Sequence, residues 1–382
     1  MEALSRSAWA EIDLDSIAHN ARAVSRLVGP SDLCAVVKAN SYGHEAELVA
    51  KTALDNGASW LAVATVEEGV ELRDARISAP ILLLIEPERQ NVEAALKSDL
   101  TISVDRPELV WEVAAARERI WGDQREIKIQ IHVDTGMYRA GCNLEEAIEI
   151  AKLARSAGCS IQGLWSHLAV ADNLRDGRSF TFEQLRRFEA TRLALAAVGC
   201  YPEICHIANS AGATAYPASR YDMVRVGIEI YGYQPSLQVP FPGLRPAFSL
   251  KARITHLRNV KAGEAVSYGR TRTLASNSVI ATIPIGYADG VPRSLFDGGG
   301  EVLVRGERRP VAGVITMDQM MVDLGSDSQV PVGEEVTLIG RQDGEFVGAD
   351  EWAEKTGTIA YEILARIGPR IPRIFIRGSA GS

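Results

Sequence analysis

The stretch CAVVKANSYGHE, residues 34–45, sets the pattern of this chain, because a short apolar run ends there on a lysine. Such a run is typical of a buried β-strand, and Lys38 follows it directly. A lysine in this position can extend its ammonium from the strand end into solvent, which is the ordinary arrangement. It can also be desolvated, so that its amine stays partly neutral and can form a Schiff base. The remainder of the sequence has to decide between the two.

Seven further apolar runs of the same kind follow along the chain. They are WLAVA (60–64), ILLLI (81–85), LTISV (100–104), IKIQIHV (127–133), IQGLWSHL (161–168), ICHIA (204–208) and MVRVG (223–227). Between them lie amphipathic stretches whose apolar residues recur at three- and four-residue spacing, as in helices. Eight strands that alternate with helices predict an α/β fold with a closed (β/α)8 TIM-like barrel. An open doubly wound sheet is the alternative, but no GxGxxG motif follows the first strand.

After about residue 240 the pattern changes to one typical of β structure. PFPGLRP (240–246) has the composition of a linker, and beyond it strand-like runs alternate with turns. One late helix is expected around GADEWAEKTG (348–357), and the opening SAWAEIDLD (7–15) alternates as a strand would and could pair with this second domain. We therefore assign residues 10–240 to the barrel and residues 241–382, together with 1–9, to a mainly β domain.

Composition excludes several classes of protein. A length of 382 residues favours two domains, and a net charge of −8 argues against nucleic acid as a partner. Five scattered cysteines without a CxxC pair predict a reducing compartment, no disulfide framework and no metal site. The purest apolar run, ILLLI, is too short to cross a membrane, and acids interrupt the N-terminus before any signal-like stretch. We expect a soluble cytoplasmic protein.

Polar residues gather at the predicted C-terminal ends of the barrel strands, where barrel enzymes place their active sites. They are Lys38, His132, Asp134, His167, Ser210 and Arg225. Each alone could be structural, for instance a buried histidine or an ion-pair partner, but together they predict a pocket.

The segments after the last two strands are the usual phosphate cradle of such barrels. Here they read ANSAG (208–212) and VGIEIYG (226–232), and they offer the Ser210 hydroxyl and the amides of Gly227 and Ile228. A phosphorylated cofactor opposite a Schiff-base lysine suggests pyridoxal phosphate.

Motifs spread over nearly the whole chain carry a family resemblance. They are WAEIDLDSIAHN, AVVKANSYGHE, VDTGMYRAG, SHLAVAD, ANSAG, DMVRVGIEIYG, VSYGR, IPIGYADGVPR, MDQMMVDL and GTIAYEILARIGPRIPR. In this order they resemble the alanine racemase family, and Lys38 resembles its pyridoxal-phosphate lysine. The resemblance implies racemisation of alanine by two bases, with Lys38 serving the D-face and Tyr268 the L-face. It also implies a head-to-tail homodimer with shared active sites.

The same resemblance implies roles for further residues. His167 would hydrogen-bond the catalytic tyrosine, and Arg225 would face the pyridine nitrogen, to which a guanidinium donates a hydrogen bond without readily giving up its proton. The implied phosphate contacts are Tyr42, Ser210, the amides of Gly227 and Ile228, and Tyr361. The implied substrate-carboxylate contacts are Arg139 and the amide of Met317, with Tyr287 and Asp318 beside them.

Three positions depart from the family pattern. His132 stands where many members carry a lysine that becomes a carbamate and steadies the arginine of the DTGM motif. Val314 and Asn173 replace polar groups of the entrance channel, with Asp172 in its expected place. These departures leave a racemase of serine or of a broader range of amino acids as the alternative to alanine.

Two other classes resemble only part of this pattern. Decarboxylases of the same architecture use a cysteine late in the chain, whereas the last cysteine here is Cys205. A non-catalytic pyridoxal-phosphate-binding protein would lack the second domain that bears the SYG and MDQ motifs, and it remains a distant alternative.

Overall fold

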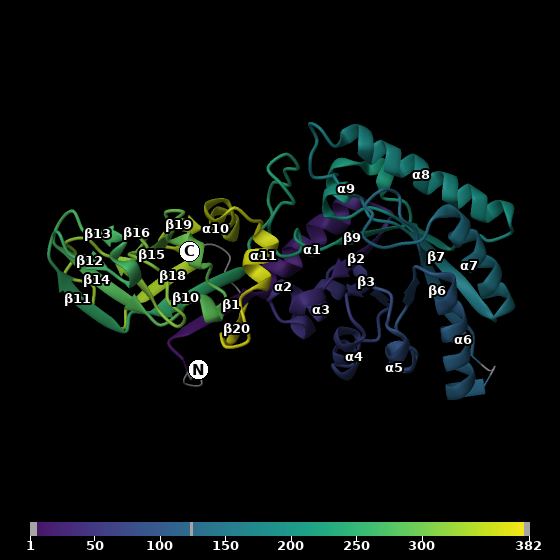
Figure 1. Cartoon of the computed structure of the whole chain (residues 1–382), viewed down its shortest axis with the longest axis horizontal. Helices are drawn as coiled ribbons and strands as arrows, with labels where there is room; N and C mark the ends of the chain where they lie inside the picture. The colour runs from purple at the N-terminus through teal and green to yellow at the C-terminus, as the bar shows by residue number, and fades with distance from the viewer. Residues whose placement is uncertain (1–5, 123–124, 378–382) are drawn as a thin grey trace. The chain divides into compact units, whose positions relative to one another are not determined.

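The computed structural model describes residues 6–122 and 125–377 and divides into two compact units (Figure 1). The barrel unit comprises residues 17–41 and 46–245, and the strand-rich unit comprises the described parts of 1–16, 42–45 and 246–382. Residues 1–5 and 378–382, which we assigned to the β domain, lie outside the described residues.

Eight parallel strands build the barrel unit. They are β2 (Asp32–Val36), β3 (Ala58–Val63), β4 (Ile81–Leu83), β5 (Ile102–Val104), β6 (Ile127–His132), β7 (Cys159–Trp165), β8 (Ile204–His206) and β9 (Met223–Val226). Hydrogen bonding orders them as β4-β3-β2-β9 and β5-β6-β7-β8. A parallel bridge between Leu82 and Thr101 joins β4 to β5, and the Arg225 amide donates to the Ala208 carbonyl between β8 and β9. The ring is thereby closed, which confirms the (β/α)8 barrel.

Helices connect these strands and lie outside them (Figure 1). They are α1 (Leu14–Val28), α3 (Ala46–Leu54), α4 (Val66–Asp74), α5 (Val92–Lys97), α6 (Pro107–Trp121), α7 (Leu144–Ser156), α8 (Arg178–Ala197) and α9 (Ser210–Ala215), whereas the segment labelled α2 (Lys38–Tyr42) is a left-handed turn. Local sequence fixes several of their starts. Thr65 with Glu68 and Asn143 with Glu146 form capping boxes, in which each side chain accepts a hydrogen bond from the other residue's amide.

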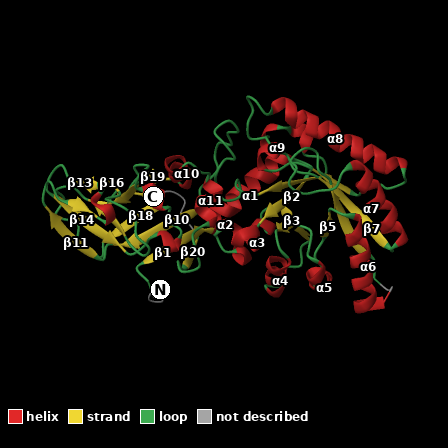
Figure 2. Ribbon diagram, viewed as in Figure 1, coloured by secondary structure: helices red, strands yellow, loops and turns green. Residues whose placement is uncertain are grey.

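The strand-rich unit is built on one large sheet ordered β16-β15-β18-β10-β1-β20, with β19 paired to β18 (Figure 2). Two smaller sheets, β11-β14-β17 and β12-β13, complete it. The bounds are β1 (Ala8–Asp13), β10 (Phe248–Arg253), β11 (His256–Val260), β12 (Ala265–Val266), β13 (Arg272–Thr273), β14 (Ser278–Ile283), β15 (Glu301–Val304), β16 (Glu307–Pro310), β17 (Met320–Asp323), β18 (Glu335–Gln342), β19 (Glu345–Val347) and β20 (Arg373–Ile376). Its helices are α10 (Ala349–Thr356), the expected late helix, and α11 (Ala360–Ala365).

The first strand belongs to the strand-rich unit. β1 pairs antiparallel with β10 and parallel with β20, so residues up to 16 group with that unit. This is the pairing that the alternation of the opening residues allowed for, although our expected boundary at residue 10 fell inside the strand. The segment 42–45 also groups with the strand-rich unit, although it directly follows the lysine-bearing turn.

The barrel interior is polar at several positions. Gln130, His132, His206 and Arg225 are all buried, beside apolar side chains such as Trp165. Buried polar groups need hydrogen-bond partners, so four of them together mark a candidate site rather than an ordinary apolar core.

In the described part of the chain no helix is long and apolar enough to cross a bilayer.

Candidate active site

Lys38 lies where β2 ends, at the start of a strained turn. Residues 39–42 all have φ between 50° and 53°, a left-handed turn of four residues that are not glycine. This conformation costs about 1–2 kcal/mol per residue, so the surrounding structure must hold it. Within the barrel unit, the amide of Ala39 donates to Glu68 Oε1 at 2.6 Å and the amide of Ala46 donates to Asn40 Oδ1 at 2.8 Å. The turn fixes the point from which the Lys38 side chain emerges.

The environment of Lys38 favours its neutral amine. Burial lowers the pKa of Lys38, the positive charge of Arg139 lowers it further, and the carboxylate of Glu68 opposes both. A lowered pKa makes a lysine a better nucleophile at neutral pH. The structure therefore favours the desolvated lysine over one that simply reaches solvent.

Arg225 lies at the centre of a buried polar network on β9. Its guanidinium donates to the Ser166 carbonyl at 2.6 Å, to His206 Nδ1 at 2.6 Å and to His167 Nδ1 at 3.2 Å. It also lies over the Trp165 ring, 4.7 Å from the ring centroid. Burial lowers the pKa of Arg225 to about 10, so the group is still a cation at neutral pH.

The network fixes the protonation of two histidines. A guanidinium only donates hydrogen bonds, so Nδ1 of both His167 and His206 must accept, which leaves the proton on Nε2. His206 Nε2 accordingly donates to Gln130 Oε1 at 2.7 Å. Burial and the charge of Arg225 hold the pKa of both histidines well below the ordinary range. His167 therefore presents a neutral ring with Nε2–H as its donor.

The predicted phosphate residues lie together after β8 and β9. Ser210 begins α9, and its hydroxyl accepts a hydrogen bond from the Gly227 amide at 3.1 Å. Ile228 is buried, and no hydrogen bond in the described ranges uses its amide. A hydroxyl beside a buried, unused amide fits an anionic phosphate group.

A buried carboxyl group follows the cradle directly. Glu229 is fully buried, its Oε1 accepts from Thr214 Oγ1 at 2.6 Å, and its Oε2 has no hydrogen-bond partner in the described chain. Burial raises the pKa of Glu229 from 4.5 to about 8. The group is therefore mostly protonated in the folded chain at neutral pH.

Replacing Glu229 with glutamine is expected to flatten the pH dependence of stability. Because the folded pKa exceeds the unfolded one, Glu229 contributes stability below about pH 4.5 that is lost as pH rises through about 8. The expected loss is a few kcal/mol, which thermal unfolding between these pH values measures. Glu149→Gln, at an exposed position of α7, is the control and should leave the pH profile unchanged. A wild-type profile in Glu229→Gln would contradict the burial argument.

Arg139 lies in a short loop between β6 and α7. The Asp134 carboxylate accepts hydrogen bonds from the amides of Gly136, Met137 and Tyr138 at 2.9–3.1 Å and so shapes the first half of the loop. Arg139 itself is exposed, and among the described residues no hydrogen bond or ion pair holds its guanidinium. The group is therefore free to take an anionic substrate group.

His132 is buried at the end of β6, beneath this loop. Its ring stacks on Trp165 with centroids 3.7 Å apart, and its Nδ1 lies 2.8 Å from Asp105 Oδ1. This imidazole takes the position where the family resemblance places a carbamylated lysine.

Added bicarbonate is expected to leave the activity of the protein unchanged, because an imidazole held by Asp105 forms no carbamate. Initial rates of the racemisation that the family resemblance implies, with and without bicarbonate at fixed pH and ionic strength, measure this. Stimulation that depends on bicarbonate concentration would show that another amine near Arg139 is carbamylated.

In the strand-rich unit Tyr42 and Tyr361 lie together, with ring centroids 5.9 Å apart. Burial raises the pKa of Tyr42, so its phenol stays protonated and can donate a hydrogen bond to an anion. Both residues belong to the same unit, and the family resemblance implies a phosphate contact for each of them.

Three loops of the strand-rich unit carry the remaining candidates. Tyr268, Tyr287 and Met317 are 72%, 41% and 54% exposed. The Ser267 hydroxyl donates to the Val314 carbonyl at 2.6 Å, and the amide of Tyr287 donates to the Thr316 carbonyl at 3.1 Å. Three large side chains that are exposed on linked loops are typical of a surface that another molecule covers.

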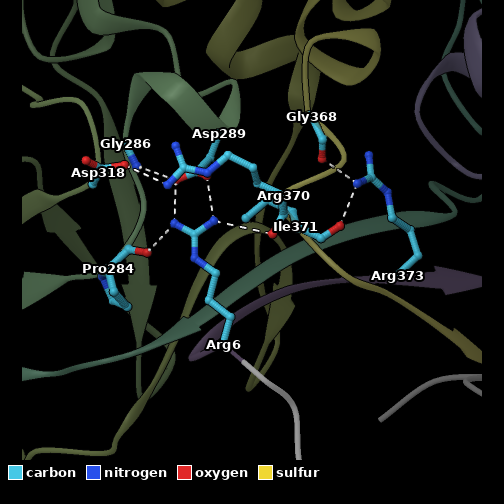
Figure 3. Close-up of polar contacts among 9 residues, drawn as sticks. All are labelled: Arg6, Pro284, Gly286, Asp289, Asp318, Gly368, Arg370, Ile371 and Arg373. Atoms are coloured by element: carbon cyan, nitrogen blue, oxygen red, sulfur yellow. Dashed lines mark hydrogen bonds and ion pairs between the residues drawn. The ribbon is translucent and has the colours of Figure 1, made fainter.

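An ion-pair cluster braces two of these loops (Figure 3). The buried carboxylate of Asp289 accepts two hydrogen bonds from the Arg6 guanidinium, at 2.5 Å to Oδ1 and 2.7 Å to Oδ2. Arg370 lies 3.4 Å from Asp289 and donates to Asp318 Oδ1 at 2.7 Å. Because Asp318 adjoins Met317, the cluster fixes the loop whose amide is the candidate carboxylate contact.

Several residues of the barrel site were missed by sequence reasoning. Glu68, Asp105, Trp165 and His206 all lie at the C-terminal ends of barrel strands or just beyond them. His206 and Trp165 fall inside predicted strands, so a reading of every strand end could have found them. Asp105 directly follows the predicted strand 100–104, so the same reading could have found it, whereas Glu68 lies on α4 and gave no signal in the sequence.

The fold and the candidate site together define a class of enzyme: a (β/α)8 barrel with a partly buried lysine after its first strand and a serine hydroxyl beside backbone amides after its last strands. The comparisons with known proteins show which family this is. Residues 12–235 match the family described as "Alanine racemase, N-terminal domain" and residues 247–375 match "Alanine racemase, C-terminal domain". The chain belongs to the alanine racemase family.

Individual relatives cover nearly the whole chain. The alanine racemase of Symbiobacterium thermophilum is 45% identical over 97% of both chains. The crystal structure of alanine racemase from Bacillus anthracis with bound L-Ala-P is 38% identical, covers 98% of this chain and 96% of its own, and has a TM-score of 0.91. A histidine racemase from Leuconostoc mesenteroides is 28% identical with a TM-score of 0.87, covering 98% of this chain and 99% of its own.

Proposed function

We propose that this chain is an isomerase that interconverts L-alanine and D-alanine with pyridoxal phosphate. The observation that carries the proposal is Lys38, partly buried at the end of β2, with a pKa lowered by burial and by Arg139. Relatives at 45% and 38% identity that are named alanine racemases support alanine over the broader substrate range. The histidine racemase, at 28%, is the more distant relative of these three.

The cofactor would be held by residues that fit its chemistry. Lys38 would bind its carbonyl carbon covalently, and Ser210, Gly227, Ile228, Tyr42 and Tyr361 are the proposed phosphate contacts. When bound, pyridoxal phosphate supplies an electron sink that makes the α-proton of an amino acid acidic. Arg225 would donate a hydrogen bond to the ring nitrogen, and as a cation with a pKa of about 10 it keeps its proton at neutral pH.

Two bases are needed because the α-protons of the two enantiomers point to opposite faces of the same plane. Lys38 serves the D-face and Tyr268 the L-face in this proposal. His167, with its proton on Nε2, is suited to donate to the tyrosine oxygen and so to stabilise the phenolate. Arg139 and the amide of Met317 hold the substrate carboxylate and keep the α-carbon between the bases.

We further propose a homodimer in which each barrel site is completed by a partner. The support is the exposed position of Tyr268, Tyr287 and Met317, which must be covered by protein to act on a desolvated substrate. All five cysteines are buried and free of disulfides, which suits the reducing cytoplasm.

The test is α-proton exchange in deuterated water, followed by NMR on a panel of L-amino acids with purified protein and added cofactor. Exchange with racemisation confined to alanine is the expected result. Comparable rates with serine or larger side chains would replace alanine with a broader substrate range. No exchange with any amino acid, although the cofactor is bound, would refute a racemase.

A further inference from the structure

The Asp105 carboxylate divides its two oxygens between two partners at the rim of the barrel. Oδ1 lies 2.8 Å from Nδ1 of His132, and Oδ2 accepts the amide hydrogen of Gly141 at 3.2 Å. One partner ends β6, and the other ends the loop that carries Arg139, only two residues away. A single carboxylate thus joins the strand to the far side of the loop that leaves it.

The backbone makes this connection stiff. The Cys142 amide donates to the His132 carbonyl and the Asp134 amide to the Cys142 carbonyl, both at 2.9 Å, so the neck of the loop is closed. Gly141 has φ +103, and a Cβ there would lie 2.7 Å from the Asp134 nitrogen, so only glycine fits. The direction of the Gly141 amide, toward Asp105, is therefore fixed.

The other end of the connection is equally fixed. The amide of Asp105 donates to Glu86 Oε2 at 2.7 Å, and Glu86 is ion-paired with Arg106. The His132 ring is parallel to Trp165 within 5°, and Trp165 donates from Nε1 to Ser103 Oγ at 3.0 Å. Since Arg225 lies over the same indole, the packing that orients His132 also touches the cofactor side of the site.

We infer that Asp105 and His132 form a positioning pair that sets the loop of Arg139 for the substrate carboxylate. Neither residue touches the substrate in this inference: Asp105 acts through the Gly141 amide, and His132 acts by holding the Asp105 carboxylate in place. Among the described residues, the pair makes no contact with the Arg139 guanidinium itself. It holds the backbone of the loop from which Arg139 extends. The inference rests on the proposed function, because it takes Arg139 as the group that binds the carboxylate.

Asp105→Asn is the most specific variant, because it replaces one carboxylate oxygen with an amide nitrogen and keeps the shape of the side chain. An amide keeps one oxygen acceptor but presents a donor in place of the other, so it can satisfy His132 Nδ1–H or Gly141 N–H but not both. We expect KM for both alanine enantiomers to rise about tenfold, the effect of losing one charge-assisted hydrogen bond. The kcat should change less, because the loop holds the carboxylate in ground state and transition state alike.

The two amide replacements of His132 form a matched pair. His132→Asn places a donor near the position of Nδ1 and can still hold Asp105, whereas His132→Gln extends its amide toward the position of Nε2. We expect the KM of His132→Asn to stay within about threefold of the wild-type value. The KM of His132→Gln should rise about as much as that of Asp105→Asn, because this variant loses the hydrogen bond to Asp105. If packing on Trp165 were the only role of the ring, the two variants would behave alike.

Amide hydrogen exchange over residues 134–142 gives a readout that does not depend on catalysis. Asp105→Asn and His132→Gln should exchange faster there than wild type and His132→Asn. Asp222→Asn is the control, because Asp222 accepts the Cys205 amide at 2.8 Å just before β9, at the other end of the barrel strands. It should leave both KM and exchange in this loop unchanged.

The outcomes separate this inference from the proposed function. If the wild-type protein does not racemise alanine, the proposed function is refuted. Amide hydrogen exchange over residues 134–142 still tests the positioning pair in that case. If the Asp105→Asn variant racemises alanine with the KM of the wild type, and its amide hydrogen exchange over residues 134–142 is also that of the wild type, the positioning pair is overturned and the proposed function stands. A fall in kcat with unchanged KM would also overturn it, because that result points to a role at the reacting atoms.

Discussion

Lys38→Ala is expected to abolish racemisation of both alanine enantiomers, with kcat/KM falling by more than about 10⁴-fold. The variant loses both the covalent attachment of the cofactor and the base for the D-face. Its purified form should therefore lack the visible absorbance band of a cofactor bound through a lysine. Steady-state rates in both directions and the absorbance spectrum measure the two losses separately.

Lys128→Ala is the matched control, since Lys128 is exposed on β6 of the same unit. It should keep the absorbance band and the wild-type rate. Retention of the band in Lys38→Ala would assign the covalent lysine elsewhere. Loss of activity with loss of secondary structure would trace the effect to the strained turn after Lys38, which circular dichroism detects.

Tyr268→Phe is expected to separate the two faces of the reaction. Removing the hydroxyl should slow α-proton exchange of L-alanine by about 10²–10⁴-fold, the usual contribution of one general base. Exchange of the D-alanine α-proton at the Lys38 face should persist, and the cofactor absorbance should be unchanged. NMR of each pure enantiomer in deuterated water measures both rates.

Tyr201→Phe provides the comparison, because Tyr201 is as exposed as Tyr268, at 75%, and lies in the barrel unit. It should leave both exchange rates at the wild-type value. Equal loss on both faces in Tyr268→Phe would indicate that the tyrosine supports binding rather than proton transfer. Undiminished exchange of L-alanine would mean that another group is the L-face base.

The alternation of apolar runs and amphipathic stretches was sufficient to predict the barrel. All eight predicted strands are present, because a parallel strand buried on both faces must be apolar along its length. The boundary near residue 10 was harder to predict, because β1 alternates like many strands and its partners β10 and β20 lie more than 230 residues away. Pairing partners at such distances are set by tertiary packing.

Candidate residues at strand ends were predictable for the same reason that the strands were. Lys38, His132, His167 and Arg225 follow or end apolar runs, and in a closed parallel barrel such ends meet at one rim. The protonation of His167 was not predictable, because it depends on Arg225 donating to Nδ1 from another strand. The strain in residues 39–42 was equally hidden, since Ala, Asn, Ser and Tyr do not favour left-handed φ as glycine does.

The sequence by itself determined the order of elements, the rim residues and the family, because each follows from local pattern or from motifs read in order. Only the tertiary structure decided what those residues can do. It partly buries Lys38 and exposes its amine to the positive charge of Arg139. It also holds two histidines neutral through one guanidinium, and it sets the Asp105 carboxylate between His132 and the Gly141 amide. Electrostatic and hydrogen-bond effects depend on distance in space, and residues far apart in sequence become neighbours only when the barrel closes.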